Sequence, residues 1–279
     1  MNSSRGSNPK TLETDIVVIG GGLCGMAAAV AAAEKKVRVT LLEKMGGPGG
    51  NSAFVVGIFG AETPAQRRLQ IDTPKDELFK RQMAFSHWKT NPRIFRAFLD
   101  KSAETIQWLE EKGLTFDNIP PLYHQGHTIR TWHSFKNENA SPVILKRLRE
   151  ICQELGVEMV FHCTAKRILT VDKTEVIGVL AEKKGEEMRM NAKNVIIATG
   201  GYGGNKELLK KYRPSYTEDM VYLGVPHLKG DGLRMAFEVG AANEGLGTLI
   251  LHPHFSQGPE AVTGIAQEPS TLWVNKMGE

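Results

Sequence analysis

A glycine-rich turn between a short apolar run and an alanine-rich run constrains this chain more than any other feature. Residues 15–19 read Asp-Ile-Val-Val-Ile, which predicts a buried strand. Gly-Gly-Gly-Leu-Cys-Gly follows at 20–25, and the alanine-rich stretch 26–36 predicts a helix. A second strand is expected at 37–42, so residues 15–42 form a βαβ unit of the length that this motif requires.

The spacing of the glycines predicts a dinucleotide site. Gly20 permits a tight exit from the strand, Gly22 lets the backbone approach a pyrophosphate, and Gly25 lets the helix pack closely on the sheet. The helix N-terminus then presents free N–H groups to the phosphates. Glu43, 21 positions after Gly22, is placed to accept hydrogen bonds from ribose hydroxyls and to repel the 2′-phosphate of NADP. The alternative is a plain strand-to-helix turn in a doubly wound sheet.

Composition indicates a globular protein with a sizeable core. The chain has 279 residues, of which 41% are hydrophobic and 24% charged, with a net charge of +4. Lysines and arginines occur in dispersed pairs, which is typical of solvated faces rather than of a nucleic-acid or membrane patch. The three cysteines, Cys24, Cys152 and Cys163, form no CxxC or CxxCH motif and favour a reducing compartment.

The N-terminal segment carries no recognisable targeting signal. Residues 1–14 are polar, lack an apolar signal-peptide core and are expected to be a disordered leader. The apolar stretch 16–33 approaches the length of a membrane span, but its glycines and its change of period favour a strand followed by a helix. We therefore expect a cytoplasmic protein without a membrane span.

Three later segments favour FAD over NAD. The loop 46–52, Gly-Gly-Pro-Gly-Gly-Asn-Ser, offers backbone N–H groups as a second cradle, or else is a flexible surface loop. The segment 194–201 predicts a buried strand and a small-residue turn, after β-rich sequence at 157–190. Gly230-Asp231-Gly232 opens a helix expected at 233–239, and Asp231 is placed to cap it.

Taken in order, the segments DIVVIGGGLCG, LLEK…GGNS, VIIATGGYGGN and GDGLRMAFEVGA resemble the fumarate reductase/succinate dehydrogenase flavoprotein family. The resemblance covers about residues 14–279. It implies an α/β fold: a Rossmann-like FAD-binding domain, with a parallel sheet flanked by helices and a small added β-meander, plus the start of a capping domain. We expect a leader at 1–14, the FAD-binding domain at 15–247 and the incomplete capping domain at 248–279.

The resemblance also implies which residues contact FAD. Gly20, Gly22 and Gly25 would surround the pyrophosphate, and Glu43 would hold the adenosine ribose with Lys44 beside it. The other predicted cofactor-binding residues are Leu23, Cys24, Gly49, Gly50, Asn51, Ser52, Gly57, Ala165, Ala198, Thr199, Gly200 and Asp231.

The mode of FAD attachment can also be predicted. Relatives that tether the flavin covalently carry a histidine directly after the serine of this loop. Here that position is Ala53, which predicts noncovalent FAD.

The middle of the chain predicts helices at 75–88, 92–113 and 142–155. Helical spacing places Ile94, Phe95, Phe98, Ile106 and Leu109 on one face, and Phe95, Phe98 and Trp108 are expected in the core.

Three histidines gather at 124–133. An ordinary polar loop and a lining for the active site are both open readings of this segment. A metal site is disfavoured, because the histidine spacing matches no standard motif and no Asp or Glu stands among them.

The last thirty residues carry the only candidate catalytic residue, His252. The stretch 251–254 matches an HPT-like motif whose histidine binds a substrate carboxylate in the family, but His254 replaces the threonine. This departure weakens the case for a C4 dicarboxylate, and a structural histidine is the alternative. The sequence stops before the family's proton-donating arginine, so we expect a fragment or a truncated product that does not turn over alone.

For a full-length relative, the resemblance implies a CH–CH oxidoreductase that transfers hydride between the flavin and one carbon of an activated C=C bond. The partners would be a small-molecule substrate and a separate electron donor or acceptor. Two alternatives remain: a noncatalytic or partner-dependent FAD-binding fragment, and an NAD-linked dehydrogenase.

Overall fold

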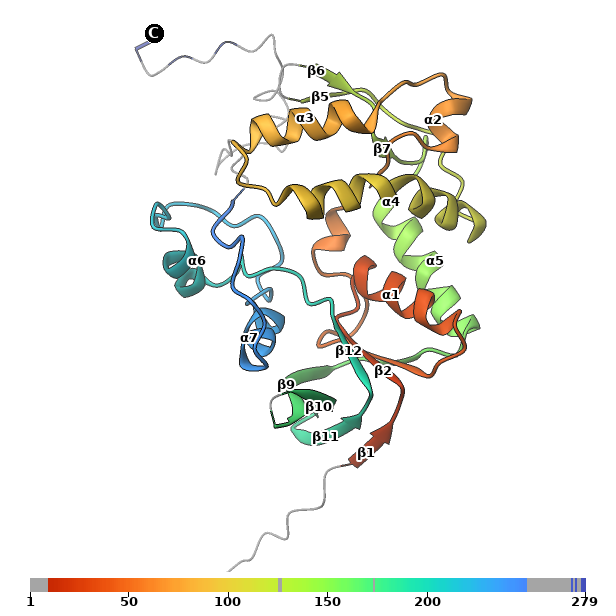
Figure 1. Ribbon diagram of the computed structural model, residues 1–279, viewed down its shortest axis with the longest axis vertical. Coiled ribbons are helices and arrows are strands. Elements are labelled where there is room, and N and C mark those ends of the chain that lie inside the picture. Colours follow the sequence, from red (N-terminus) through yellow and green to blue (C-terminus); the bar gives the residue numbers. More distant parts are fainter. Residues whose placement is uncertain (1–9, 125–126, 173, 250–271, 273, 275–276) are drawn as a thin grey trace, which may run out of the picture. The chain divides into compact units, whose positions relative to one another are not determined.

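Strand β2 (Ile16–Ile19), helix α1 (Leu23–Ala33) and strand β3 (Val39–Leu42) form the expected βαβ unit in the computed structural model (Figure 1). The structure describes residues 10–124, 127–172, 174–249, 272, 274 and 277–279. The chain divides into two compact units. Unit 1 comprises residues 1–56, 112–114 and 138–246, and unit 2 comprises residues 57–111, 115–137 and 247–279.

Unit 1 is built on a parallel sheet of order β12-β2-β3-β8, where β8 is Glu158–Val160 and β12 is Asn194–Ile197. Val17 and Ile19 belong to the core on one face, and side chains alternate between faces along a strand, so Val18 lies on the other. The segment 194–197 was expected to be buried. It is the edge strand instead, and Ile197 is 38% exposed.

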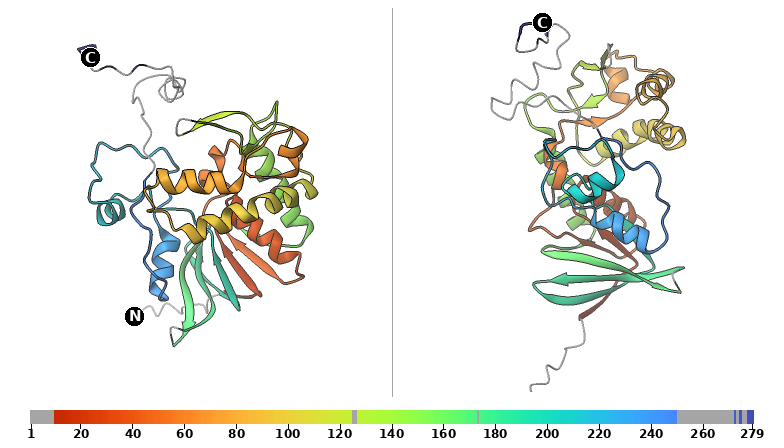
Figure 2. Two further views of the ribbon diagram at one scale, coloured as in Figure 1. Left: turned by 45° about the horizontal axis from the view of Figure 1, so that its top comes forward. Right: turned by 90° about the vertical axis from the view of Figure 1, so that its left-hand side faces the viewer.

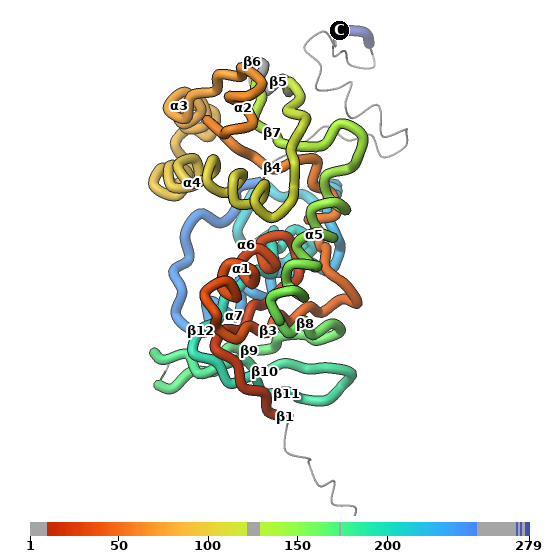
Figure 3. The backbone as a smooth tube through the Cα atoms, turned by 90° about the vertical axis from the view of Figure 1, so that its right-hand side faces the viewer, coloured from red at the N-terminus to blue at the C-terminus, as the bar shows by residue number. Residues whose placement is uncertain are grey.

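A second sheet of unit 1 supplies the expected β-meander. Its order is β1-β11-β10-β9, formed by β1 (Lys10–Glu13), β9 (Cys163–Val171), β10 (Glu175–Lys183) and β11 (Glu186–Asn191). Residues 10–13, which the sequence assigned to a leader, thus pair in parallel with β11. Figures 2 and 3 show the meander across one face of the parallel sheet, with α1 and α5 (Ala140–Glu154) over the other. The two sheets share one apolar core.

The remaining elements of unit 1 are short and follow strand ends. They are the 3-10 helix η1 (Gly50–Phe54), α6 (Lys206–Tyr212) and α7 (Asp231–Glu238). Met235 of α7 joins the core between the two sheets, and this contact fixes the helix beside β9.

Unit 2 is mainly helical. It contains α2 (Pro64–Arg68), α3 (Lys75–Phe85) and α4 (Pro92–Glu111). Its strands form two small antiparallel pairs: β4 (Ile58–Phe59) with β7 (Trp132–His133), and β5 (Leu122–His124) with β6 (His127–Ile129). A small core of Ala61, Leu78 and Leu99 is flanked by partly buried phenylalanines.

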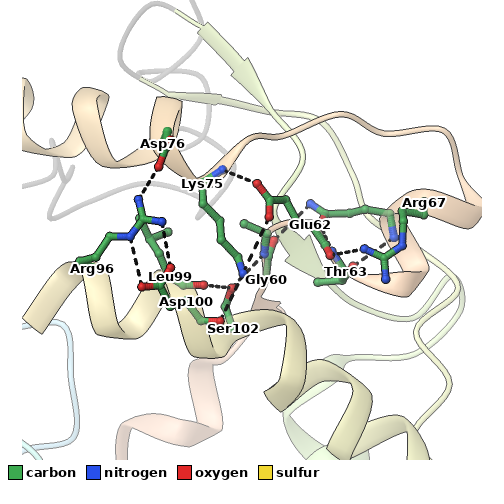
Figure 4. A network of polar contacts seen from close by, with 12 residues as sticks. Gly60, Glu62, Thr63, Arg67, Lys75, Asp76, Arg96, Leu99, Asp100 and Ser102 are labelled. Carbon is green, nitrogen blue, oxygen red and sulfur yellow. Dashed lines mark hydrogen bonds and ion pairs between the residues drawn. The ribbon is translucent and has the colours of Figure 1, made fainter.

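Polar contacts tie the start of α3 to α4 in unit 2 (Figure 4). Arg96 of α4 pairs with Asp76 of α3 and with Asp100. The Lys75 ammonium donates to the carbonyl of Asp100 at 3.2 Å, and its backbone N–H donates to Glu62 at 3.0 Å. These contacts hold the two helices together where the hydrophobic core is small.

The helices predicted from sequence exist, with shifted ends. Helix α3 ends at Phe85, and His87 and Trp88 just beyond it take positive φ angles of 48° and 58°. The buried residues of α4 are Leu99, Ser102, Ile106 and Leu109, so part of the predicted apolar face does lie in the core. Phe95 and Trp108, which were expected in the core, are partly buried. Phe98 is 48% exposed, so placing it in the core was wrong. No helix within the described residues has both the length and the hydrophobicity needed to cross a membrane.

Candidate cofactor-binding site

The turn between β2 and α1 in unit 1 requires glycine because backbone atoms approach it closely. Gly20 has a φ of +110°, and a Cβ there would lie 2.4 Å from the carbonyl oxygen of Ala198. A Cβ on Gly25 would lie 1.9 Å from the carbonyl oxygen of Gly20. Backbone cannot yield as a flexible side chain can. These two glycines therefore hold α1 against the ends of β2 and β12.

The N-terminus of α1 is only partly capped. Its N-cap residue is Gly22, which has no side chain, and no acidic residue occurs in the first turn. The Ser52 hydroxyl accepts a hydrogen bond from Leu23 N at 3.0 Å. The positive end of the helix dipole thus faces the loop 49–52, and no first-turn residue carries a negative charge.

Glu43, at the end of β3, supports the glycine turn directly. One carboxylate oxygen accepts from Gly21 N at 2.7 Å, and the other accepts from Met45 N at 2.7 Å. Each carboxylate oxygen has a second lone pair, so Glu43 retains acceptor capacity for two hydroxyl groups. The structure therefore shows a positioning role that spacing alone did not reveal.

Lys44 and Asp231 form an ion pair, with 2.8 Å between the ammonium and the carboxylate. Both side chains are partly buried, and Lys44 also donates to the carbonyl of His227. The prediction that Asp231 caps α7 was wrong. The N-cap is Gly230, which adopts a left-handed conformation, and no side chain caps the helix. Asp231 is the first helical residue and turns its carboxylate to Lys44 instead.

These elements surround a cavity of about 750 Å³ within unit 1. Its lining includes most of the predicted cofactor-binding residues: Gly20, Gly22, Cys24, Glu43, Lys44, Gly49, Gly50, Asn51, Ser52, Ala165, Ala198, Thr199, Gly200 and Asp231. The parallel strands β2, β3 and β12 all end at this cavity, as ligand sites in open α/β sheets do.

Four predicted residues are not in the lining. Leu23 and Gly25 lie in the first turn of α1, where Leu23 N binds Ser52 and Gly25 is buried against Gly20. Gly57 belongs to unit 2, where a Cβ would lie 2.8 Å from the carbonyl oxygen of His133. That close approach accounts for a glycine at 57. His252 lies outside the described residues.

Sequence reasoning missed part of the lining. The additional residues include Cys163, Thr164, His227, Leu228, Met235 and Ala236. Met235 and Ala236 follow Gly232 in α7. A Cβ added at Gly232 would lie 2.1 Å from the Thr199 hydroxyl, so the Gly-Asp-Gly motif did indicate that this helix approaches the cavity wall closely. Burial raises the pKa of the Cys163 thiol, which keeps it protonated and unreactive.

The histidine segment has a structural role at His133. This side chain is fully buried in unit 2, where one ring nitrogen lies 2.7 Å from the Thr63 hydroxyl. The other lies 3.2 Å from the carbonyl oxygens of Ile58 and Thr131. Burial lowers the pKa of His133, so it is neutral near pH 7. The side chains of His124 and His127 are outside the described residues, and no metal-binding cluster occurs in the rest.

The residues of the cavity fit a dinucleotide. Gly22 leaves space beside Ser52, because a Cβ at this position would lie 3.1 Å from the Ser52 hydroxyl. The N-terminus of α1, which has no acidic residue in its first turn, favours an anion there. The volume falls within the range of small-molecule and cofactor sites.

Comparison with known proteins decides which dinucleotide. A family model described as an FAD binding domain matches residues 15–279. The chain belongs to this family. FAD is therefore the cofactor, and the Rossmann-like fold and the resemblance to fumarate reductase flavoproteins are confirmed.

Curated relatives of this FAD-binding protein are reductases. The chain is 31% identical to vinyl phenol reductase of Lactiplantibacillus plantarum, over 95% of this chain and 55% of the relative. It is 30% identical to a probable fumarate reductase of Shewanella frigidimarina, over 86% of this chain and 41% of the relative. The chain thus spans about half or less of the length of these relatives.

Solved structures agree on the fold. The open conformation of a flavocytochrome c3 fumarate reductase matches with a TM-score of 0.77 and 28% identity, over 84% of this chain and 41% of that chain. A 3-ketosteroid-Δ4-(5α)-dehydrogenase from Rhodococcus jostii matches with a TM-score of 0.74, 22% identity and coverage of 84% and 57%, which supports the fold alone.

Proposed function

We propose that this chain is the FAD-binding portion of a flavin-dependent oxidoreductase that reduces or forms an activated C=C bond. The observation that carries the proposal is the glycine-lined cavity at the strand ends of unit 1, in a chain of the FAD-binding family. The names of its relatives, vinyl phenol reductase, fumarate reductase and acrylate reductase, support the bond type.

In this proposal the protein holds FAD through groups that the fold already orients. The N-terminus of α1 and the loop at Gly49–Ser52 receive the pyrophosphate, and the free lone pairs of Glu43 accept hydrogen bonds from the ribose hydroxyls. The opposite charges of Lys44 and Asp231 compensate each other in the wall of the cavity. The bound isoalloxazine supplies the redox chemistry, while the protein binds, orients and excludes water.

FAD is held noncovalently in this proposal. Ala53 follows Ser52 in η1 and carries no nucleophile at the position where covalent relatives have histidine. Ultrafiltration after denaturation tests this directly: all flavin is expected in the filtrate, and flavin retained on a peptide would refute it.

The substrate is a small molecule with an electron-withdrawing group, and His252 binds that group. This role follows from the match of residues 251–254 to the family's HPT-like motif. We further propose a separate electron donor or acceptor, which the names NADH:fumarate oxidoreductase and acrylate reductase flavoprotein subunit of two relatives support. The three free cysteines favour a cytoplasmic location.

A second candidate is a noncatalytic FAD-binding protein that needs a partner chain. Anaerobic photoreduction of the FAD-loaded chain, followed by fumarate, acrylate or a vinyl phenol, separates the two. Flavin reoxidation by at least one alkene, but not by its saturated product, supports the oxidoreductase. Bound flavin that no alkene reoxidises supports the second candidate.

A further inference from the structure

The segment 222–229 of unit 1, which we name the cavity strap, reaches the cofactor cavity near its C-terminal end. His227 and Leu228 are part of the cavity lining, and Leu228 is buried. Lys44, another lining residue, donates to the carbonyl of His227. The strap is therefore part of what encloses the cofactor, although it has no helix or strand of its own.

One end of the strap is fastened to the start of α6. Gly204 N donates to the carbonyl of Leu228 at 3.0 Å, and the Asn205 side chain donates to the carbonyl of Lys229 at 3.0 Å. A Cβ on Gly204 would lie 2.7 Å from the carbonyl oxygen of Pro226, so the two backbones approach closely. This end is held by one backbone hydrogen bond and by the Asn205 side chain, without a contact from the loop 49–52.

The other end is fastened by a single side chain, that of Asn51 in η1. Its carbonyl oxygen accepts from Val225 N at 2.9 Å, and its amide nitrogen donates to the Tyr222 hydroxyl at 3.2 Å. Both the oxygen and the nitrogen of the Asn51 side-chain amide are thus hydrogen-bonded within the protein. The same residue lines the cavity, in the loop that faces the N-terminus of α1.

Two glycines form a seat for the ring of Tyr222. A Cβ on Gly203 would lie 2.3 Å from Cε2 of the ring, and a Cβ on Gly224 would lie 2.2 Å from its hydroxyl. The hydroxyl is thereby aimed at Asn51, although its neighbours Val221 and Leu223 are 63% and 52% exposed. The hydrogen bond to Asn51 therefore accounts for the position of Tyr222 better than burial of its ring does.

We propose that Asn51 is a positioning residue that ties the cavity strap to the loop 49–52, and that this tie slows the release of FAD. Without it, the hydrogen bonds left between the strap and other described segments are those from Lys44 and at the α6 end. Residues 222–226, which lead to His227 and Leu228 in the cavity wall, would lose their fastening to the loop 49–52. The inference rests on FAD occupying this cavity and concerns its retention, not the reaction.

The test compares FAD dissociation rates of the wild type, Asn51→Ala, Tyr222→Phe and the double variant. Loss of two hydrogen bonds predicts about 5- to 30-fold faster release for Asn51→Ala, and loss of one predicts about 2- to 5-fold for Tyr222→Phe. The double variant should release FAD no faster than Asn51→Ala, since both changes remove the same bond. Tyr216→Phe is the matched control, because the Tyr216 hydroxyl has no described hydrogen bond.

A readout without FAD keeps the inference separate from the proposed function. Hydrogen exchange of the apoprotein should show faster exchange at Val225 in Asn51→Ala and unchanged exchange in α1. Wild-type rates of FAD release in both single variants, or additive effects in the double variant, would overturn the inference. Failure of the wild type to bind FAD would instead overturn the proposed cofactor role. If Asn51→Ala does not fold, Tyr222→Phe, which keeps its ring, decides alone.

Discussion

The cofactor cavity of unit 1 and the His133 network of unit 2 both join polar groups that are far apart in the sequence. They differ in whether those groups are all paired within the protein. Both ring nitrogens of His133 lie against protein partners, and the side chain is fully buried. At the cavity, the N-cap residue of α1 is a glycine without a capping side chain, its first turn has no acidic residue, and glycines keep space open in front of it. A polar network closed on itself stabilises a fold, whereas one left open beside a cavity marks a binding site.

The largest effect is expected from a substitution that disrupts the cavity. Gly25→Val should abolish FAD binding, lowering affinity at least about 100-fold, and should destabilise the protein by about 3 kcal/mol or more. The reason is the 1.9 Å separation between a Cβ at this position and the Gly20 carbonyl oxygen. FAD titration and urea unfolding measure both effects. Gly47→Ala is the control, since no atom lies within 4 Å of its Cβ. Equal behaviour of the two variants would contradict the account.

The next effect breaks the network of unit 2 and should leave the cavity intact. His133→Ala removes contacts to Thr63 and to two carbonyls, and should lower the free energy of unfolding by about 3 kcal/mol. FAD affinity of the folded protein should stay within about twofold. The exposed His87, replaced by Asn, is the control. A selective loss of FAD affinity in His133→Ala would show that the network serves the site.

Lowering the pH should reduce the free energy of unfolding through the titration of His133. Burial lowers the pKa of His133 in the folded state, so the unfolded state binds a proton first as pH falls below about 6.5. The free energy of unfolding should therefore fall by at most about 1.4 kcal/mol per pH unit from this group below that pH, until the folded-state pKa is reached. Urea unfolding of the wild type and His133→Asn checks this. The variant should lose that part of the slope, and parallel curves would contradict it.

The smallest effect sharpens the role of the Lys44–Asp231 pair. Asp231→Asn leaves the partly buried Lys44 without its carboxylate partner and should weaken FAD binding about 3- to 10-fold. Glu104→Gln, in the exposed Lys101–Glu104 pair, should change nothing measurable. Isothermal titration with FAD compares them, and identical affinities would remove Asp231 from the site.

The predictability of the two regions also differs, for a physical reason. Gly20, Gly25 and the run of apolar residues in β2 reflect local backbone requirements, so sequence spacing identified the βαβ unit. The resemblance to a known family then added many of the residues that line the cavity. The tie of Asn51 to the strap joins residues more than 170 positions apart, and no local pattern encodes it.

Errors occurred where tertiary contacts override local preference. Asp231 follows Gly230 at a helix start, which favours capping, yet Lys44, from the loop after β3, attracts its carboxylate. Phe98 has helical spacing but lies on the more exposed side of α4, because Leu99 and Ser102 face the core. The histidine segment resembled a site in composition alone, and only packing shows that His133 is structural.

Titration of the purified chain with FAD, followed by absorption and by ultrafiltration before and after denaturation, tests the central claim most directly. We expect a bound flavin with a perturbed spectrum that is retained by the folded protein and passes the filter completely after denaturation. Gly47→Ala should behave like the wild type, and Gly25→Val should retain no flavin. A folded wild-type chain that leaves the spectrum of added FAD unchanged and retains none of it would contradict the account.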